Sequence, residues 1–375
     1  MQFSAARYLD DWRELAPTLA DWRTDHPGLG VLALLPAAEG ERIDAVQAAC
    51  RAQGIPLCGA VFPALIAERR FVDRGILLLR FDHCPAWILV DTTAPGAVHP
   101  VRALAETASQ GLTAFAPGKP TFFLIFDCLL PNVGSMLHAL YLALGKRVHY
   151  AGINAGNDNF QPITCLFDGE RRLKNGVFGM LTASHPVVRH AYPLPENPLR
   201  AVSVAGNRID NIEGRPPFEV YRDIVLRDRG VELTRENFYE HAVHYPFGEI
   251  SALDVLVRMP MCIENDGSLK CIGEVPANSL LKLLRAPSLT ESHCIEQLAE
   301  GLRPHAGPHD TLLAFYCAGR RQHLGSDAEC ELSMLEQACE VDRVVGAVSM
   351  GEIDTARQIG IPQLHHAALV CCRGK

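Results

Sequence analysis

Two clusters of polar residues and glycines lie close together in the last third of the chain. Each follows an apolar run typical of a buried strand, first TLLAFYC and then VVGAV. We expect the segment AGRRQHLG, after the first run, to form a turn that leads into a helix. Because a helix would connect the two runs, we expect the strands to be parallel and their ends to face one ligand pocket. The expected pocket residues are Cys317, Gly319, Arg320, Ser349, Gly351 and Glu352.

These residue types suit a zwitterionic or anionic ligand. The guanidinium of Arg320 offers a planar pair of donors for a carboxylate. Gly319 and Gly351 would let backbone N–H groups approach a bound anion, and Glu352 could accept a ligand ammonium group. The set therefore predicts recognition of both ends of an amino acid. The alternative is that Arg320 forms a buried structural ion pair with Glu352 or Glu331.

Cys317 offers a different chemistry. It ends a buried strand beside Arg320 and Arg321, whose charges would favour the thiolate and hence nucleophilic or redox behaviour. The sequence identifies no partner histidine, although His365 and His366 follow on a nearby strand. A Cys317-dependent hydrolase is thus one alternative, and a small core residue at a strand end is the other.

The elements that would position these residues recur along the chain. A strand, a helix, a second strand, a glycine turn and a further strand follow one another three times along the chain. From the first strand residue to the closing glycine, the three units span residues 31–59, 121–152 and 311–346. A strand–helix–strand crossover favours a parallel pair, so repeated units of this kind predict an α/β (mixed α+β) fold with mixed sheets covered by helices. The alternative is the chance rhythm of any α/β protein.

Two local patterns complete this outline. Ser326 and Glu329 have the spacing of a capping box for the helix of the third unit. Between the second and third units, residues 199–286 hold short apolar runs separated by turn sequences such as EGRPP and ENDG. That region predicts largely antiparallel β structure.

Composition limits the class of protein. The chain has 375 residues, 48% of them hydrophobic, and a formal net charge of -8, so we expect a globular protein with no nucleic-acid partner. Its apolar runs are shorter than the ~20 residues of a membrane helix, and its N-terminus is acidic rather than signal-like. We therefore expect a cytoplasmic protein without membrane insertion. Its thirteen cysteines lack paired spacing and indicate reduced core thiols.

Several segments resemble the FIST proteins, named for F-box and intracellular signal transduction. YAGINAGND is similar to a glycine-alanine-glycine-aspartate segment of that family, and IEGRPPFEVY, VRMP, DGSLKCIGEVP, CAGRR and GAVSMGEI follow in the family order. The resemblance covers residues 30–372. It implies a FIST N-terminal domain over residues 1–198 and a FIST C-terminal domain over residues 199–375, with the break near YPLPENPLR.

One segment departs from the family pattern. PLCGAVFPALI stands where the family usually has a glycine-cysteine-serine-threonine-alanine-glycine-glutamate run, and it keeps only Gly59 and a small neighbour. The first two units likewise keep the glycine but lack the arginine and glutamate of the third. We therefore expect the glycines to be architectural, and Cys317, Arg320 and Glu352 to carry the function.

The resemblance implies a sensory module rather than an enzyme. The family suggests a small ligand, amino-acid-like or another anionic metabolite, in prokaryotic signalling. We expect a stand-alone sensor, without a kinase, cyclase or chemotaxis-type output segment, which would act through a partner such as a histidine kinase or a cyclic-dinucleotide enzyme. One branch of the family is associated with haem-based nitric oxide sensing. Haem needs an axial ligand in an apolar cleft, and the fifteen histidines do not single one out.

Overall fold

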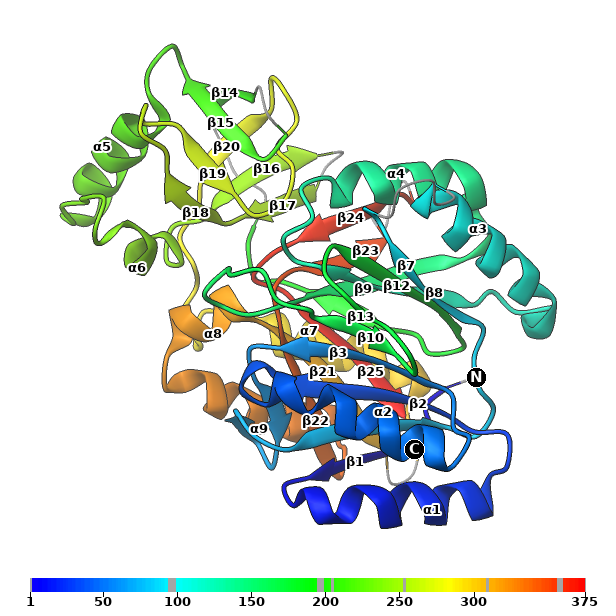
Figure 1. The fold of residues 1–375 in the computed structure, drawn as a ribbon. Coiled ribbons are helices and arrows are strands. Elements are labelled where there is room, and N and C mark those ends of the chain that lie inside the picture. Colours follow the sequence, from blue (N-terminus) through cyan, green and yellow to red (C-terminus); the bar gives the residue numbers. More distant parts are fainter. Residues whose placement is uncertain are drawn as a thin grey trace.

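Three six-stranded sheets and one seven-stranded sheet, with helices on their faces, make up the part of the chain that the structure describes (Figure 1). The structure is a computed structural model. It describes residues 2–93, 99–193, 199–203, 206–251, 254–307, 310–355 and 360–374. The mixed α+β class predicted from the sequence is confirmed.

The three six-stranded sheets are built from three equivalent units. Each unit is an outer strand, a helix, a first main strand, a further helical segment, a second main strand, a two-stranded hairpin and a return strand. The first unit contains β1 (Ala5–Leu9), α1 (Leu15–Asp25), β2 (Gly30–Pro36), α2 (Ile43–Ala52), β3 (Leu57–Phe62), β4 (Leu65–Ala67), β5 (Arg70–Val72) and β6 (Ile76–Phe81).

The other two units follow the same order. The second contains β7 (Trp87–Asp91), α3 (Pro100–Gly111), β8 (Thr121–Asp127), α4 (Val133–Leu144), β9 (His149–Ala155), β10 (Leu166–Asp168), β11 (Arg172–Leu173) and β12 (Gly176–Thr182). The third contains β13 (Val187–Arg189), α7 (Cys294–Leu302), β21 (Thr311–Cys317), α8 (Ala318–Leu324), α9 (Asp327–Cys339), β22 (Arg343–Ser349), β23 (Glu352–Thr355), β24 (Pro362–His365) and β25 (Leu369–Gly374). The predicted repeat is therefore present, and it is longer than the sequence pattern indicated.

The units exchange their hairpins. Hairpin β10–β11 of the second unit pairs with β3 of the first, hairpin β23–β24 of the third pairs with β9 of the second, and hairpin β4–β5 of the first pairs with β22 of the third. Each sheet is thus completed by a hairpin from another unit. The three units depend on one another for their backbone hydrogen bonds, so none of them is a self-contained domain.

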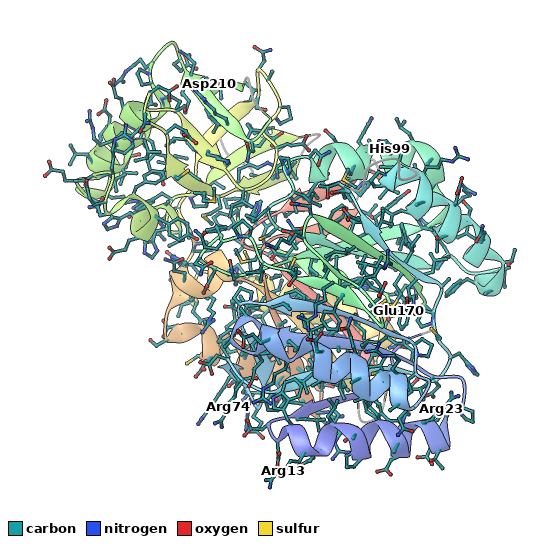
Figure 2. All side chains as sticks on the ribbon, viewed as in Figure 1. Arg13, Arg23, Arg74, His99, Glu170 and Asp210 are labelled. Carbon is teal, nitrogen blue, oxygen red and sulfur yellow. The ribbon has the colours of Figure 1, made fainter. Side chains whose placement is uncertain are left out.

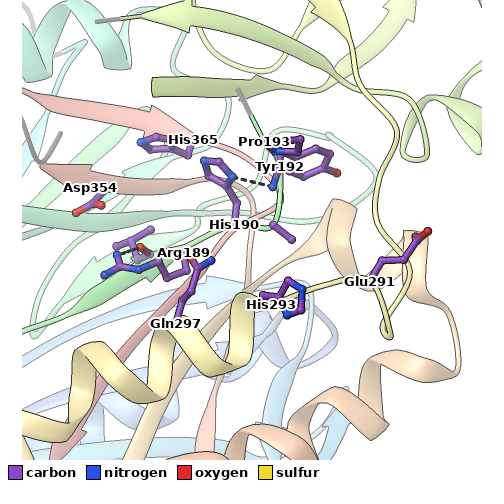
Figure 3. Close-up of a pocket in the computed structure, with 11 residues that line it drawn as sticks. Arg189, His190, Tyr192, Pro193, Glu291, His293, Gln297, Asp354 and His365 are labelled. Atoms are coloured by element: carbon purple, nitrogen blue, oxygen red, sulfur yellow. Dashed lines mark hydrogen bonds between the residues drawn. The ribbon is translucent and has the colours of Figure 1, made fainter. Parts of the chain in front are cut away.

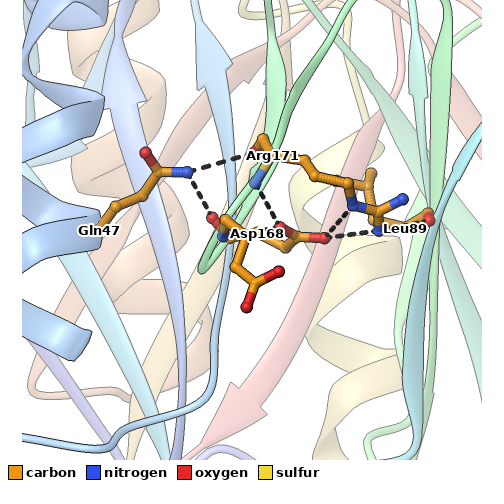
Figure 4. A network of polar contacts seen from close by, with 5 residues as sticks. Gln47, Leu89, Asp168 and Arg171 are labelled. Carbon is orange, nitrogen blue, oxygen red and sulfur yellow. Dashed lines mark hydrogen bonds and ion pairs between the residues drawn. The ribbon is translucent and has the colours of Figure 1, made fainter.

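Figure 4 shows how one exchanged hairpin is fixed to its host. The carboxylate of Asp168 accepts the backbone N–H groups of Glu170 and Arg171 at 2.9 and 2.7 Å. The Arg171 side chain returns to that carboxylate at 2.6 Å and also donates to the carbonyl oxygen of Leu89 at 3.0 Å. Gln47, on α2 of the first unit, donates to the carbonyl oxygen of Asp168 at 2.7 Å. The turn of a hairpin from the second unit is thereby fastened to the first.

The two main strands of each unit are parallel, as predicted, and a glycine occupies the same register position in every pair. The facing residues are Ala33 and Gly59, Leu124 and Gly152, and Ala314 and Gly346. A Cβ atom added to Gly152 would lie 2.2 Å from the carbonyl oxygen of Leu124, and one added to Gly346 would lie 1.7 Å from that of Ala314. The expectation of a glycine turn is wrong, because these glycines lie inside strands that approach too closely for a side chain.

The seven-stranded central sheet interrupts the third unit between β13 and α7. Its strands are β14 (Leu199–Ser203), β15 (Arg208–Ile212), β16 (Phe247–Ser251), β17 (Asp254–Arg258), β18 (Pro260–Ile263), β19 (Leu269–Cys271) and β20 (Leu280–Leu283). All their pairings are antiparallel, as predicted. Two helices that were not predicted, α5 (Pro217–Arg229) and α6 (Phe238–Ala242), lie on the outer side of this sheet (Figure 1). The prolines of EGRPP, taken as a turn, precede and begin α5, where proline is compatible with a helix.

Two residues from the family-like segments fasten the central sheet to the units. Glu274 accepts hydrogen bonds from the backbone N–H and the hydroxyl of Ser135, both at 2.6 Å. Ser135 is in the first turn of α4, where the helix dipole favours a carboxylate. Arg258 pairs with Glu249 at 2.9 Å, both buried, and donates to the carbonyl oxygen of Leu364 in β24 at 2.5 Å. The segments VRMP and DGSLKCIGEVP therefore have a docking role.

Two local predictions for the third unit are wrong, and a third concerns residues outside the described part of the chain. Ser326 makes no side-chain capping bond, because its backbone is already helical, and Glu329 instead accepts the backbone N–H of Phe71 at 3.2 Å. The segment AGRRQHL, expected as a turn, forms the short helix α8. The expected domain break at residues 198 and 199 borders residues 194–198, which lie outside the described part of the chain.

Charged side chains such as Arg13, Arg23 and Arg74 project from the outside of the first unit (Figure 2). Nowhere in the described ranges is there a helix long and apolar enough to cross a membrane. All thirteen cysteines are free, and Cys330 is the one among them that is exposed. Reduced core thiols, as the sequence indicated, account for most of them.

The close approach at Gly346 predicts a large loss of stability on substitution. We expect Gly346→Ala to lower the free energy of unfolding by about 3 kcal/mol, because the strands must separate to admit the methyl group. Gly40→Ala is the matched control, since a Cβ there meets nothing within 4 Å, and should change stability by less than about 0.5 kcal/mol. Urea denaturation of both variants measures the difference. Equal stabilities would contradict the packing role of Gly346.

Candidate functional site

The structure brings Cys317, Ser349 and Glu352 together. Cys317 ends β21 and faces Ser349 at the end of the parallel strand β22. Glu352 begins the exchanged strand β23, three residues further on. The carboxyl ends of neighbouring parallel strands are where open α/β sheets commonly bind ligands. The two clusters singled out in the sequence therefore meet at such an edge.

Glu352 is fully buried within this cluster. Its carboxyl group accepts hydrogen bonds from the hydroxyl of Ser349 at 2.5 Å and from the backbone N–H of Ala368 at 3.2 Å. Burial raises the pKa of Glu352 to about 8. Near neutral pH the group is thus mostly protonated, and it acts as a hydrogen-bonding group rather than as a counter-charge for an ammonium.

Cys317 is a protonated thiol in this environment. Burial, and secondly the neighbouring Glu352, raise the pKa of Cys317 far above its ordinary value. Its sulfur accepts the backbone N–H of Ala367 at 3.0 Å. The expectation that two arginines would favour the thiolate is wrong. Arg320 is paired elsewhere, and the guanidinium of Arg321 lies over the ring of Phe71, 4.6 Å from its centroid.

Arg320 forms the buried ion pair that the sequence left open as an alternative, and Glu331 is its partner. Its Nε and Nη2 atoms donate to the two carboxylate oxygens of Glu331 at 2.8 and 2.5 Å, and Nη2 also reaches the Ser292 hydroxyl at 3.0 Å. The Tyr316 hydroxyl donates to Glu331 at 2.5 Å. The bidentate face of Arg320 is therefore occupied by the protein itself.

Gly319 and Gly351 lie where neighbouring segments pack closely. A Cβ atom on Gly319 would lie 2.9 Å from the terminal methyl of Met259, and one on Gly351 would lie 3.1 Å from the amide nitrogen of Asn154. Asn154 also exchanges backbone hydrogen bonds with this turn, donating to Gly351 at 2.8 Å and accepting from Met350 at 2.9 Å. Both glycines thus allow elements to meet across unit boundaries.

A cavity of about 400 Å³, the His365 cavity, opens beside the cluster (Figure 3). His365 faces Glu352 across hairpin β23–β24, so both side chains leave the same face of the sheet. Tyr192 lines the cavity and is close enough to Arg320 and Cys317 to interact electrostatically with them. The polar and aromatic residues of its wall are Arg189, His190, Tyr192, Glu291, His293, Gln297, Asp354 and His365.

His365 is the unusual group in this wall. Its side chain is only 5% exposed, and its Nδ1 atom has no hydrogen-bond partner among the described residues. Burial lowers the pKa of His365 well below its ordinary value, and the nearby His190 and Arg258 lower it further. Nearly all buried polar atoms in proteins have partners. A neutral imidazole with a free nitrogen beside a cavity is therefore available to a ligand.

Most residues of this wall carry no local signal in the sequence that would place them together. Arg189 and His190 come from β13 and the residues after it, whereas His293 and Gln297 come from α7, and the central sheet separates the two segments in the chain. His365 was noted only as a histidine near Cys317. The available signal was the repeat itself, because β13 and α7 are the outer strand and first helix of the third unit.

The wall of the His365 cavity does not suit haem. Haem clefts are mainly apolar around the macrocycle, whereas this wall carries charged and amide side chains, including Arg189, Asp354 and Gln297. Among the residues described, no three His, Cys, Asp or Glu side chains are arranged to hold a metal ion. We therefore assign no haem ligand in this cavity.

The structure defines a class of protein with three units that exchange hairpins among themselves. An antiparallel sheet is inserted in the third unit. Comparison with models of protein families identifies it more closely. The FIST N domain matches residues 31–215, and the FIST C domain matches residues 217–354. The chain belongs to the FIST family. FIST domains are associated with sensory signalling and the binding of small ligands. No curated protein matches the chain in sequence.

The raised pKa of Glu352 predicts a specific pH dependence of stability. The folded state keeps this proton up to about pH 8, whereas the unfolded chain releases it near pH 4 to 5, so the free energy of unfolding should fall by roughly a few kcal/mol as the pH rises between these values. Glu352→Gln, which mimics the protonated acid, should remove that fall.

Urea denaturation at about pH 5 and about pH 8 measures this effect. Glu296→Gln is the matched control, because Glu296 is exposed on α7, and it should keep the wild-type pH dependence. A Glu352→Gln variant that loses as much stability as the wild type over this range would show that Glu352 is ionised in the folded protein.

Proposed function

We propose that this protein is a sensor that binds a small carboxylate-bearing ligand, such as an amino acid, in the His365 cavity and signals through a partner protein. The observation that carries the proposal is the unpartnered Nδ1 atom of the buried His365 beside a cavity of about 400 Å³. Cavities of this size are typical of small-molecule sites.

The charges around the cavity favour a carboxylate. Arg189 lines it (Figure 3), and no acidic side chain forms an ion pair with Arg189 in the described residues. Its Nη1 atom donates to the carbonyl oxygen of Val188, and the other N–H groups of the planar guanidinium can hold both oxygens of a carboxylate. Glu291, an acid in the same wall, is paired with Arg285. Asp354 provides negative charge in the wall, which an ammonium group of the ligand would meet.

The position of the cavity suggests how binding could be transmitted. Arg189 belongs to the sheet of the third unit, whereas His365 lies on the hairpin that completes the sheet of the second. A ligand held by both would join the two sheets. Leu364, next to His365, accepts a hydrogen bond from Arg258 of the central sheet. Ligand binding would thus alter the position of the central sheet. We propose that this sheet is the surface that binds a partner such as a histidine kinase or a cyclic-dinucleotide enzyme.

The environment of Cys317 argues against the hydrolase alternative. A nucleophilic cysteine needs a thiolate or an adjacent base, whereas the pKa of Cys317 is raised by burial. Cys317 is only 3% exposed, and its sulfur accepts a hydrogen bond from the backbone N–H of Ala367. We therefore place Cys317 beneath the ligand site rather than in a reaction.

Substitutions at the two ends of the cavity test the proposal. The standard amino acids and short dicarboxylates are screened for compounds that raise the melting temperature, and their affinities are measured by isothermal titration calorimetry. Arg189→Ala should weaken binding by about tenfold or more, because a charge-assisted pair is lost. His365→Gln should weaken it by a smaller factor.

Arg51→Ala, which removes an exposed arginine of α2 far from the cavity in sequence, is the matched control and should bind as the wild type does. Circular dichroism confirms that each variant is folded. A ligand that binds the wild type, Arg189→Ala and His365→Gln equally well lies elsewhere, and the proposed site is then wrong.

A further inference from the structure

A second cavity, of about 480 Å³, lies at the amino ends of β8 and β9. We call it the basic cavity, because five basic side chains from four segments of the chain line it. They are Lys119, Lys146, His149, His185 and His305. The segments come from the second and third units, so the hairpin-exchanged arrangement brings them together.

The basic cavity is unusual in a protein with a net charge of -8. Asp354 is the one acidic residue in the lining that the structure describes. Within that described part, Lys119 and Lys146 take part in no ion pair, whereas many surface arginines do. Positive charge is thus gathered here against the overall composition, and such a concentration attracts anions.

Two of the histidines lie face to face. The rings of His185 and His305 stack with their centroids 4.3 Å apart and their planes 10° from parallel. Two protonated imidazoles in this arrangement repel each other, so an anion beside them would stabilise the pair. Both rings line the cavity with the lysines.

The basic groups act on one another through space. Burial and the neighbouring Lys146 lower the pKa of Lys119. Burial, and then Lys119 and His185, lower the pKa of His149. Burial, His185 and then Arg373 lower the pKa of His305. An anion among these groups would reverse the shifts and take up protons as it binds.

We propose that the basic cavity is a binding site for a small phosphoryl-bearing anion, either free diphosphate or the diphosphate of a nucleotide. Several cationic donors around a space of this size match a ligand with more than one negative charge, which a monocarboxylate does not supply. The proposed anion site differs from the sensory site, because it uses neither Arg189 nor His365; Asp354 is the residue that lines both cavities. A nucleic acid is a poor fit, since the net charge opposes a long polyanion.

Calorimetric titration of the full chain with diphosphate tests this site. We expect diphosphate to bind, and the double variant Lys119→Ala/Lys146→Ala to bind about tenfold more weakly or worse. Lys174→Ala, which removes an exposed lysine that does not line the basic cavity, is the matched control and should leave the affinity unchanged. Arg189→Ala should also leave it unchanged, which separates this site from the His365 cavity.

Sulfate provides the test of proton uptake, because its charge is constant across the neutral range. Its affinity should rise by several-fold from about pH 8 to about pH 6, as His149 and His305 become protonated beside Lys119 and Lys146. Asp354 and Arg373 are the remaining charged groups near these rings.

The outcomes separate clearly. Equal binding of diphosphate and a nucleoside diphosphate would identify a site for the diphosphate alone, and tighter binding of the nucleotide would add its base or sugar to the ligand. No heat of binding at concentrations on the order of 10 mM, or an unchanged affinity in the double lysine variant, would overturn the proposal. Binding of a short RNA without binding of diphosphate would also overturn it.

Discussion

Exchange of hairpins between units is the interaction on which the rest of the structure depends. Each six-stranded sheet is completed by strands from another unit, so the backbone groups at one edge of every sheet are satisfied only when all three units are in place. The exchange also carries Glu352 and His365 of the third unit onto the sheet of the second. The candidate ligand site is thus a consequence of how the sheets are completed.

Burial decides which polar residues remain available to a ligand. Arg320 and Glu331 neutralise each other in the interior, and burial keeps Glu352 mostly protonated. The charged groups that the sequence suggested for ligand binding are therefore not available to a ligand. A buried pair of this kind tolerates little change, because removal of one partner leaves an uncompensated charge. The groups that remain available to a ligand line the His365 cavity and come from β13, α7 and the end of β24.

Periodicity in the sequence was sufficient to predict the three strand–helix–strand units, their parallel pairing and the antiparallel region between them, because those features depend on local pattern. It was not sufficient to predict the exchange, because strands as short as Leu65–Ala67 and Leu166–Asp168 carry no signal for the sheet they join. The cluster of Cys317, Ser349 and Glu352 was predictable from strand ends. Arg189 and His293 were not, because the inserted central sheet separates them in the chain.

The central claim is that a ligand bridges the sheets of the second and third units in the His365 cavity. A crystal structure of the protein with the tightest-binding carboxylate from the amino-acid screen tests it most directly. The account predicts ligand density between the guanidinium of Arg189 and the Nδ1 atom of His365. Ligand density at another place, for example between the central sheet and α4, with only solvent in the His365 cavity, would contradict it.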